Sequence, residues 1–224
     1  MEAQVVFIDV PGENVKIHAE ACYCGEGKEN GRYGIIIAHP HPKFGGNMEN
    51  NVVSALFDAL QDHPACHSVL RLNFRGVQRS TGSGSWRGWA ERADIKAAND
   101  FLMNQFPSSC NIPPPQHTII IGYSFGSVVA CGVSSEIESC AGTVAISIPL
   151  GWLSWCLFSS HYKHIVDNKL PKLLVIGSKD NFSTTRAFNN FVDSLQGENK
   201  SSAVAGKDHF WFNNEDLVVT PVLE

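Results

Sequence analysis

The most constraining feature of the sequence is the run 119–130, which reads Ile-Ile-Ile-Gly-Tyr-Ser-Phe-Gly-Ser-Val-Val-Ala. Its β-branched start predicts a buried strand, and the small residues after Gly126 predict a helix that approaches the strand closely. The pattern Gly122-x-Ser124-x-Gly126 then forms a tight strand-to-helix turn that exposes the serine hydroxyl at the end of the strand. Ser124 is therefore a candidate nucleophile. An ordinary turn remains the alternative unless a base and an acid follow downstream.

Apolar runs and helical patterns alternate along the rest of the chain. The run 34–38 has the continuity of a strand buried on both faces, and further strands are expected at 67–74, 143–148 and 173–176. Helical patterns occur at 48–61, 89–106, 151–166 and 184–195. Strands at 4–9 and 15–21, joined by a Pro-Gly turn, predict an antiparallel hairpin at one edge, and a short strand is expected at 202–204. This alternation predicts the α/β class, with a mostly parallel central sheet and helices on both faces.

Composition bears on the number of domains, the class of partner and the cellular compartment. The 224 residues are 43% hydrophobic and 17% charged, and no linker or repeat divides them, so we expect a single domain over 1–224. A net charge of −5 argues against a nucleic-acid partner. Seven cysteines without a Cys-x-x-Cys pair, and no secretory signal, predict reduced thiols in the cytoplasm. The uncharged run 143–158 is too short, and too interrupted by Pro149 and Gly151, to predict a transmembrane segment.

Two later residues supply the base and the acid that a serine nucleophile needs. Asp180 and His209 both stand just beyond short apolar strands, so they should meet Ser124 at one edge of the sheet. His209 would take the serine proton, and Asp180 would hold the imidazole in the right tautomer. Asp208 is the competing carboxylate, but neighbouring side chains on a turn rarely face each other.

Four motifs together resemble one group, the small and nearly lidless α/β-hydrolases related to dienelactone hydrolases and esterases. They are His-Pro-His-Pro-Lys-Phe-Gly-Gly-Asn-Met at 39–48, Asn-Phe-Arg-Gly-Val at 73–77, Gly-Tyr-Ser-Phe-Gly at 122–126 and Asp-His-Phe-Trp at 208–211. The resemblance begins at about residue 34 and implies the α/β-hydrolase fold with a minimal cap. The chain departs from it at Gln78, where a glycine is expected, and at Thr220-Pro221, which should cut the final helix short.

The resemblance also implies that the His-Pro-His-Pro loop supplies half of an oxyanion hole. Prolines have no N–H to donate, so His41 is the expected donor from this loop, with Lys43 as the second choice. Phe125, directly after the nucleophile, should provide the other donor.

Aromatic residues flank the motif loops and predict an apolar substrate pocket. The set expected to line it is Phe44, Trp86, Trp152, Phe182 and Phe210, with Trp155 and Trp211 as further candidates. Arg75 and Arg79 follow a strand at the same edge. One of them is expected to bind an acidic substrate group; the alternative is that Arg75 ties down its own loop by bonding backbone carbonyls.

These features predict a serine hydrolase that cleaves carboxylic esters or thioesters of compact acyl groups through an acyl-enzyme. The substrate is a small molecule, and the chemistry requires no metal or organic cofactor. His161 and His164 have metal-ligand spacing, but no third ligand lies near them in the sequence. A ligand-binding or receptor protein on the same scaffold and a short-peptide serine peptidase remain alternatives. The oligomeric state stays open.

Overall fold

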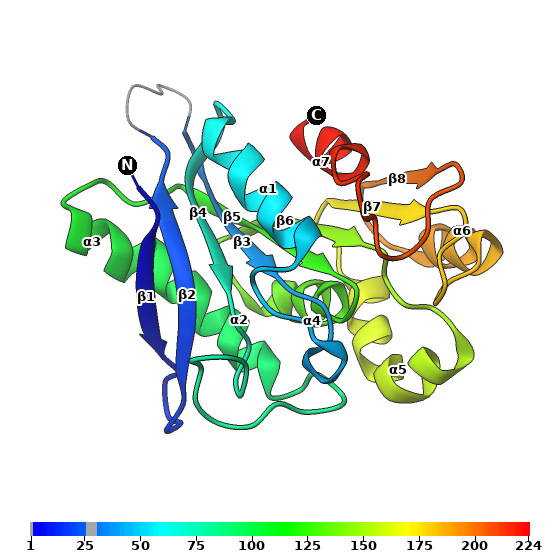
Figure 1. Cartoon of the computed structure of the whole chain (residues 1–224), viewed down its shortest axis with the longest axis horizontal. Helices are drawn as coiled ribbons and strands as arrows, with labels where there is room; N and C mark the ends of the chain where they lie inside the picture. The colour runs from blue at the N-terminus through cyan, green and yellow to red at the C-terminus, as the bar shows by residue number, and fades with distance from the viewer. Residues whose placement is uncertain (1, 26–30) are drawn as a thin grey trace.

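The computed structural model describes residues 2–25 and 31–224, and in this part of the chain eight strands form one sheet (Figure 1). The strands are β1 (Gln4–Asp9), β2 (Lys16–Tyr23), β3 (Tyr33–Ala38), β4 (Cys66–Leu72), β5 (His117–Tyr123), β6 (Cys140–Ile146), β7 (Lys172–Gly177) and β8 (Asn199–Val204). Their order is β1-β2-β4-β3-β5-β6-β7-β8. β2 is antiparallel to both of its neighbours, and all pairs from β4 to β8 are parallel. The predicted edge hairpin and mostly parallel sheet are confirmed.

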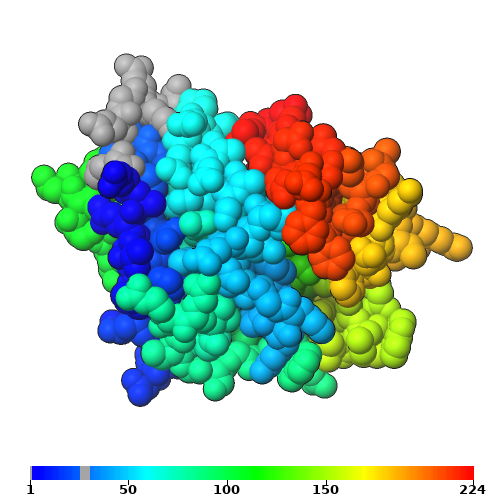
Figure 2. Space-filling view, in the orientation of Figure 1, coloured from blue at the N-terminus to red at the C-terminus, as the bar shows by residue number. Residues whose placement is uncertain are grey.

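Helices cover both faces of this sheet. They are α1 (Asn51–Asp62), α2 (Glu91–Asp100), α3 (Phe106–Cys110), α4 (Phe125–Val133), α5 (Trp152–Asp167), α6 (Thr185–Ser194) and α7 (Asp216–Leu223). α1 and α7 lie side by side on one face (Figure 2). Leu56 and Val218 belong to one apolar cluster on that face. Ile95 of α2, Phe158 of α5 and Phe188 of α6 join the cluster on the other face. The central strands are therefore covered on both sides, as the continuous hydrophobic run 34–38 predicted for β3.

Two of the expected helix ends are wrong. The helix predicted to stop at Phe106 continues through a π-helical segment, Phe101–Gln105, into α3 and ends at Cys110. Pro107 has no N–H, and the continuous helix accommodates it directly after the π-helical segment. The final helix is not cut short, since α7 runs through Pro221 to Leu223. So close to the helix end, the proline removes a single backbone hydrogen bond.

The last strand is also longer than expected. β8 runs over Asn199–Val204, whereas the hydrophobic pattern indicated only 202–204. Its first residues are polar because β8 is an edge strand with exposed side chains, so hydrophobicity did not reveal them. No helix in residues 2–25 and 31–224 combines the length and the apolar character needed to cross a bilayer.

Candidate active site

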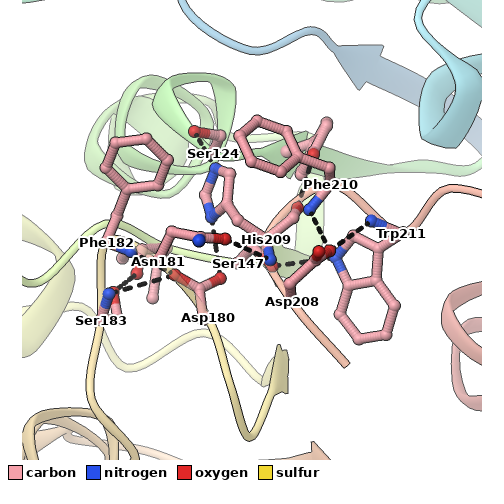
Figure 3. Close-up of polar contacts among 12 residues, drawn as sticks. Ser124, Ser147, Asp180, Asn181, Phe182, Ser183, Asp208, His209, Phe210 and Trp211 are labelled. Carbon is pink, nitrogen blue, oxygen red and sulfur yellow. Dashed lines mark hydrogen bonds and ion pairs between the residues drawn. The ribbon is translucent and has the colours of Figure 1, made fainter. Parts of the chain in front are cut away.

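Three polar side chains form a hydrogen-bonded chain at the carboxyl edge of the sheet (Figure 3). Ser124 lies between β5 and α4, Asp180 follows β7, and His209 follows β8. The Ser124 Oγ is 2.9 Å from His209 Nε2, and His209 Nδ1 is 2.8 Å from Asp180 Oδ2. The Asp180 side chain is fully buried. Because the carboxylate accepts from Nδ1, Nε2 is left to accept the serine proton, as general-base chemistry requires.

The backbone at Ser124 adopts a strained conformation. Its φ is 55° and its ψ is −120°, a region that residues with a side chain rarely occupy. A Cβ atom at Gly122 would overlap the backbone of Gly126, and one at Gly126 would lie 2.6 Å from the carbonyl oxygen of His39. Both glycines are therefore required by close backbone approach, which holds Ser124 against the end of β3.

Replacing Gly126 with Ala should lower the free energy of unfolding by about 2–4 kcal/mol, because backbone atoms on two elements must move apart. Gly12→Ala is the matched control. Gly12 has a φ of 77° but no atom within 4 Å of the added Cβ, so its cost should stay at about 1–2 kcal/mol. Urea denaturation of both variants measures the difference, and equal losses would contradict the close-approach account.

Asp208 and Asp180 accept hydrogen bonds from different groups. Its Oδ1 accepts the backbone N–H groups of Phe210 at 3.0 Å and Trp211 at 3.4 Å (Figure 3). It therefore shapes its own turn and does not face the imidazole. Asp180 uses its other oxygen, Oδ1, to accept the N–H of Phe182 at 2.8 Å.

The loop that carries His209 is held by contacts that sequence reasoning did not identify. The Tyr123 hydroxyl donates to the His209 carbonyl at 2.7 Å, and Asn181 Oδ1 accepts the His209 N–H at 3.2 Å. Trp211, considered a candidate for the pocket wall, is instead buried, and its Nε1 donates to Ser147 Oγ at 3.0 Å. Only the position of Tyr123 beside the serine gave a sequence signal, because the other contacts join distant segments.

The loop after β3 leaves one amide free. The N–H of Lys43 donates to His41 Nδ1 at 3.1 Å, and those of the next three residues donate to carbonyls within the loop. Pro40 and Pro42 have none to give. Within the described residues, the His41 N–H donates to no protein group. The Phe125 N–H begins α4 and so has no acceptor within the helix.

No protein-family model matches this chain. The chain is 29% identical to the uncharacterized protein RP471 of Rickettsia prowazekii, over 83% of this chain and 79% of that protein. The structure of XC6422 from Xanthomonas campestris, an α/β serine hydrolase without lid, aligns with a TM-score of 0.80 and 21% identity, covering 99% of this chain and 92% of its own. An α/β serine hydrolase homologue from Coxiella burnetii aligns with a TM-score of 0.80 and 24% identity, covering 100% and 97%. The Pyrococcus furiosus esterase Pf2001 aligns with a TM-score of 0.76 and 19% identity, covering 99% and 90%.

This chain has the α/β-hydrolase fold. Between β6 and β7 the fold carries only one helix, α5, in place of a larger cap. Leu153 and Ser154, near the start of α5, therefore lie beside the Ser124 edge of the sheet.

An apolar cleft of about 450 Å³ opens beside Ser124 in this α/β-hydrolase fold. Four of the five aromatic residues expected to line it do so: Phe44, Trp86, Phe182 and Phe210. Residues that were not expected also line it, namely Pro149, Leu153, Leu157, Phe158 and Phe212. Leu153 and Leu157 are four apart on α5, so a helical stripe in the sequence would have revealed them.

Trp152 was wrongly predicted to line the pocket. It is the first residue of α5, and 80% of it is exposed to solvent. The inward face of α5 instead presents Leu153 and Leu157 to the cleft. Trp155 also lies outside the lining and packs its ring 4.6 Å from that of Tyr162.

The two arginines have structural contacts away from the cleft. Arg75 is buried, and its Nε lies 2.9 Å from Asp94 Oδ1 while its Nη1 lies 2.7 Å from Glu13 Oε2. It thus anchors its loop through ion pairs, and not through the backbone carbonyls expected for this role. The Arg79 guanidinium lies over the ring of Phe7, 4.6 Å from its centre. Among the described residues, no Arg, Lys, Asp or Glu lines the cleft.

Gln78, which replaces the expected glycine, adopts a φ of 48°. This left-handed conformation is the one that glycine adopts most easily. The Gln78 side chain accepts a hydrogen bond from Asn73 Nδ2 at 2.7 Å, which offsets part of the strain.

His161 and His164 do not form a metal site with other residues. In residues 2–25 and 31–224, no group of three His, Cys, Asp or Glu side chains is arranged to hold a metal ion. His161 is buried, its Nε2 lies 2.8 Å from the carbonyl oxygen of Arg87, and its ring packs on Trp89. Burial lowers the pKa of His161 from 6.5 to about 4.

This burial predicts a pH dependence of stability. Between pH 6.5 and 4 the unfolded chain binds the proton while the folded His161 does not, so the free energy of unfolding should fall as the pH is lowered. The contribution of His161 is about 2–3 kcal/mol over that interval. Denaturation of wild type and His161→Phe at pH 7 and pH 4.5 measures it. The variant should lose less stability on acidification than wild type, and equal losses would contradict this assignment.

Proposed function

We propose that this protein is a serine hydrolase that cleaves carboxylic esters or thioesters through an acyl-enzyme intermediate. The observation that carries the proposal is the hydrogen-bonded chain from Ser124 through His209 to Asp180. A serine hydroxyl is a poor nucleophile without such a base, and a buried carboxylate has few other reasons to accept from this imidazole. The strained backbone of Ser124 supports the same function, because strain of this kind concentrates at reactive sites.

In the proposed mechanism, the Ser124 Oγ attacks the substrate carbonyl carbon while His209 Nε2 takes its proton. Asp180 stabilises the imidazolium that forms. The carbonyl oxygen becomes an oxyanion, which accepts hydrogen bonds from the N–H groups of His41 and Phe125. His209 then protonates the leaving alcohol or thiol, and a water molecule repeats the sequence on the acyl-enzyme to release the acid.

The lining of the cleft supports the proposal that the acyl group of the substrate is neutral and compact. Its walls are formed by aromatic and aliphatic side chains such as Phe44, Leu153 and Phe182, and no cation among the described residues faces it. A carboxylate on the acyl group would lose its hydration without gaining a partner. The same lack of charge argues against a peptidase that must bind a charged peptide terminus.

We therefore expect kcat/KM for p-nitrophenyl butyrate to exceed that for p-nitrophenyl palmitate, and to exceed that for the anionic p-nitrophenyl hemisuccinate by at least about tenfold. Arg79→Ala should leave the ratio of the neutral to the anionic ester unchanged, since Arg79 contacts Phe7 outside the cleft. Steady-state kinetics on the three esters measures both expectations. Faster hydrolysis of the palmitoyl or the succinyl ester would overturn the substrate class.

A further inference from the structure

His39, the first histidine of the His-Pro-His-Pro loop, makes two hydrogen bonds from a fully buried position at the end of β3. Its Nε2 accepts the backbone N–H of Phe74 at 3.0 Å, and its Nδ1 lies 2.6 Å from the carbonyl oxygen of Pro40. A neutral imidazole has one donor and one acceptor nitrogen. Since Nε2 accepts, Nδ1 carries the proton and donates it to the Pro40 oxygen.

This donation fixes the direction of the next amide. The Pro40 carbonyl and the His41 N–H belong to one trans peptide, so they point in opposite directions. A Cβ atom at Gly46 would overlap the Pro40 oxygen, so the Gly46 backbone packs closely against that oxygen. With the carbonyl held there, the His41 N–H must face away from His39.

Because His39 is fully buried and does not line the cleft beside Ser124, the side of this peptide that faces away from His39 is the one left to face the cleft. Pro40, His41, Ser124 and Phe125 all line that cleft. If the peptide turned over, the Pro40 carbonyl would replace the His41 N–H on this side. A partial negative charge would then face the developing oxyanion, where a donor is required.

We propose that His39 is a positioning residue that locks the Pro40–His41 peptide and so aims the His41 N–H at the oxyanion of the reaction. The inference rests on the serine hydrolase function proposed above. His39 acts through the peptide and does not touch the substrate, since it is fully buried and lies outside the cleft lining. Burial lowers the pKa of His39 to about 4, so the ring keeps its neutral, donating form at the pH of ordinary assays.

Two substitutions separate the two hydrogen bonds of His39. In His39→Asn, the amide nitrogen is attached to Cγ, as Nδ1 is, so it can still donate to the Pro40 oxygen, while the bond to Phe74 is lost. In His39→Gln, the amide oxygen lies one atom farther out, as Nε2 does, so it can still accept from Phe74, while the donation to Pro40 is lost. Each variant removes one hydrogen bond, so the two should lose similar stability.

Their kinetics should differ. We expect His39→Gln to lower kcat for p-nitrophenyl butyrate by about 10²–10³-fold with little change in KM, the loss typical of one oxyanion donor. His39→Asn should retain most of the wild-type kcat, because it keeps the donation to the Pro40 oxygen. Urea denaturation of both variants measures their free energies of unfolding and shows whether the loss of kcat merely follows the loss of stability. Equal kcat in the two variants, or losses of kcat proportional to losses of stability, would overturn the proposal.

A second measurement does not depend on activity. The ¹⁵N chemical shifts of the His39 ring at pH 7 should report a proton on Nδ1 and none on Nε2, and the reverse assignment would overturn the proposal. An inactive wild-type protein with the Nδ1–H form of His39 would contradict the proposed function and not the tautomer. Active wild-type protein with equal kcat in the two variants would contradict the role of His39 alone.

Discussion

Replacing Ser124 with Ala is expected to lower kcat for an activated ester by about 10⁶-fold, the scale seen when a triad loses its nucleophile. The Ser124 Oγ, 2.9 Å from His209 Nε2, is the atom that forms the acyl bond in the proposed mechanism. His209→Ala should cause a similar loss, and the double variant should add little, because the members of a triad act as a unit. Steady-state hydrolysis of p-nitrophenyl butyrate measures these losses.

The fold should survive the Ser124→Ala change. Alanine is smaller than serine and keeps a Cβ in the same strained turn, so the free energy of unfolding should change by less than about 1 kcal/mol. A Ser124→Ala variant that is folded and retains wild-type kcat would contradict the nucleophile assignment. A double variant whose loss equals the product of the single losses would contradict the coupling of Ser124 to His209.

Asp180→Asn should lower kcat by about 10⁴-fold while leaving the fold intact. The amide oxygen can still accept the N–H of Phe182, which is 2.8 Å from Asp180 Oδ1. The amide nitrogen would instead face His209 Nδ1, now 2.8 Å from a carboxylate oxygen. Because that nitrogen donates, it favours the imidazole tautomer with its proton on Nε2, which cannot accept from Ser124.

Asp208→Asn is the matched control for this change. Asp208 accepts backbone N–H groups of its own turn, and an asparagine oxygen can do the same. Its kcat should stay within about threefold of wild type, because Asn replaces Asp in such turns at little cost. Measured on the same ester, a loss at Asp208 as large as that at Asp180 would mean that the carboxylates were assigned the wrong roles.

The central part of the fold was predictable because its signals are local. The run 119–130 encodes a strand, a turn and a helix in consecutive residues, and the structure has β5, Ser124 and α4 in that order. The strands predicted before Asp180 and before His209 also placed these two residues at the same edge, since parallel strands end together.

Other features depended on contacts between distant segments and were not predictable. The partners of Arg75 are a turn between β1 and β2 and a helix that begins sixteen positions later, at Glu91, so no local pattern reveals them. The orientation of Trp152 depends on which face of α5 packs on the sheet, and its aromatic character alone could not decide this. The length of β8 was underestimated because an edge strand needs no apolar side chains at its exposed positions.

The roles of the two histidines in the loop after β3 also depend on contacts that the sequence does not reveal. Their alternation with prolines indicated an unusual turn, but only the folded chain distinguishes their surroundings. His39 bonds both to Pro40 of its own loop and to Phe74 of a neighbouring loop, whereas His41 Nδ1 accepts the N–H of Lys43 within its own loop. Sequence reasoning therefore identified the loop and missed the role that we assign to its first histidine.

Covalent labelling of wild-type protein with a fluorophosphonate probe tests the central claim most directly. If His209 and Asp180 activate Ser124, the probe should add to the folded protein once, and peptide mass spectrometry should place the adduct on Ser124. Ser124→Ala should take up no probe. Wild-type protein that resists the probe and hydrolyses no activated ester, or that carries the label on another residue, would contradict the serine hydrolase account.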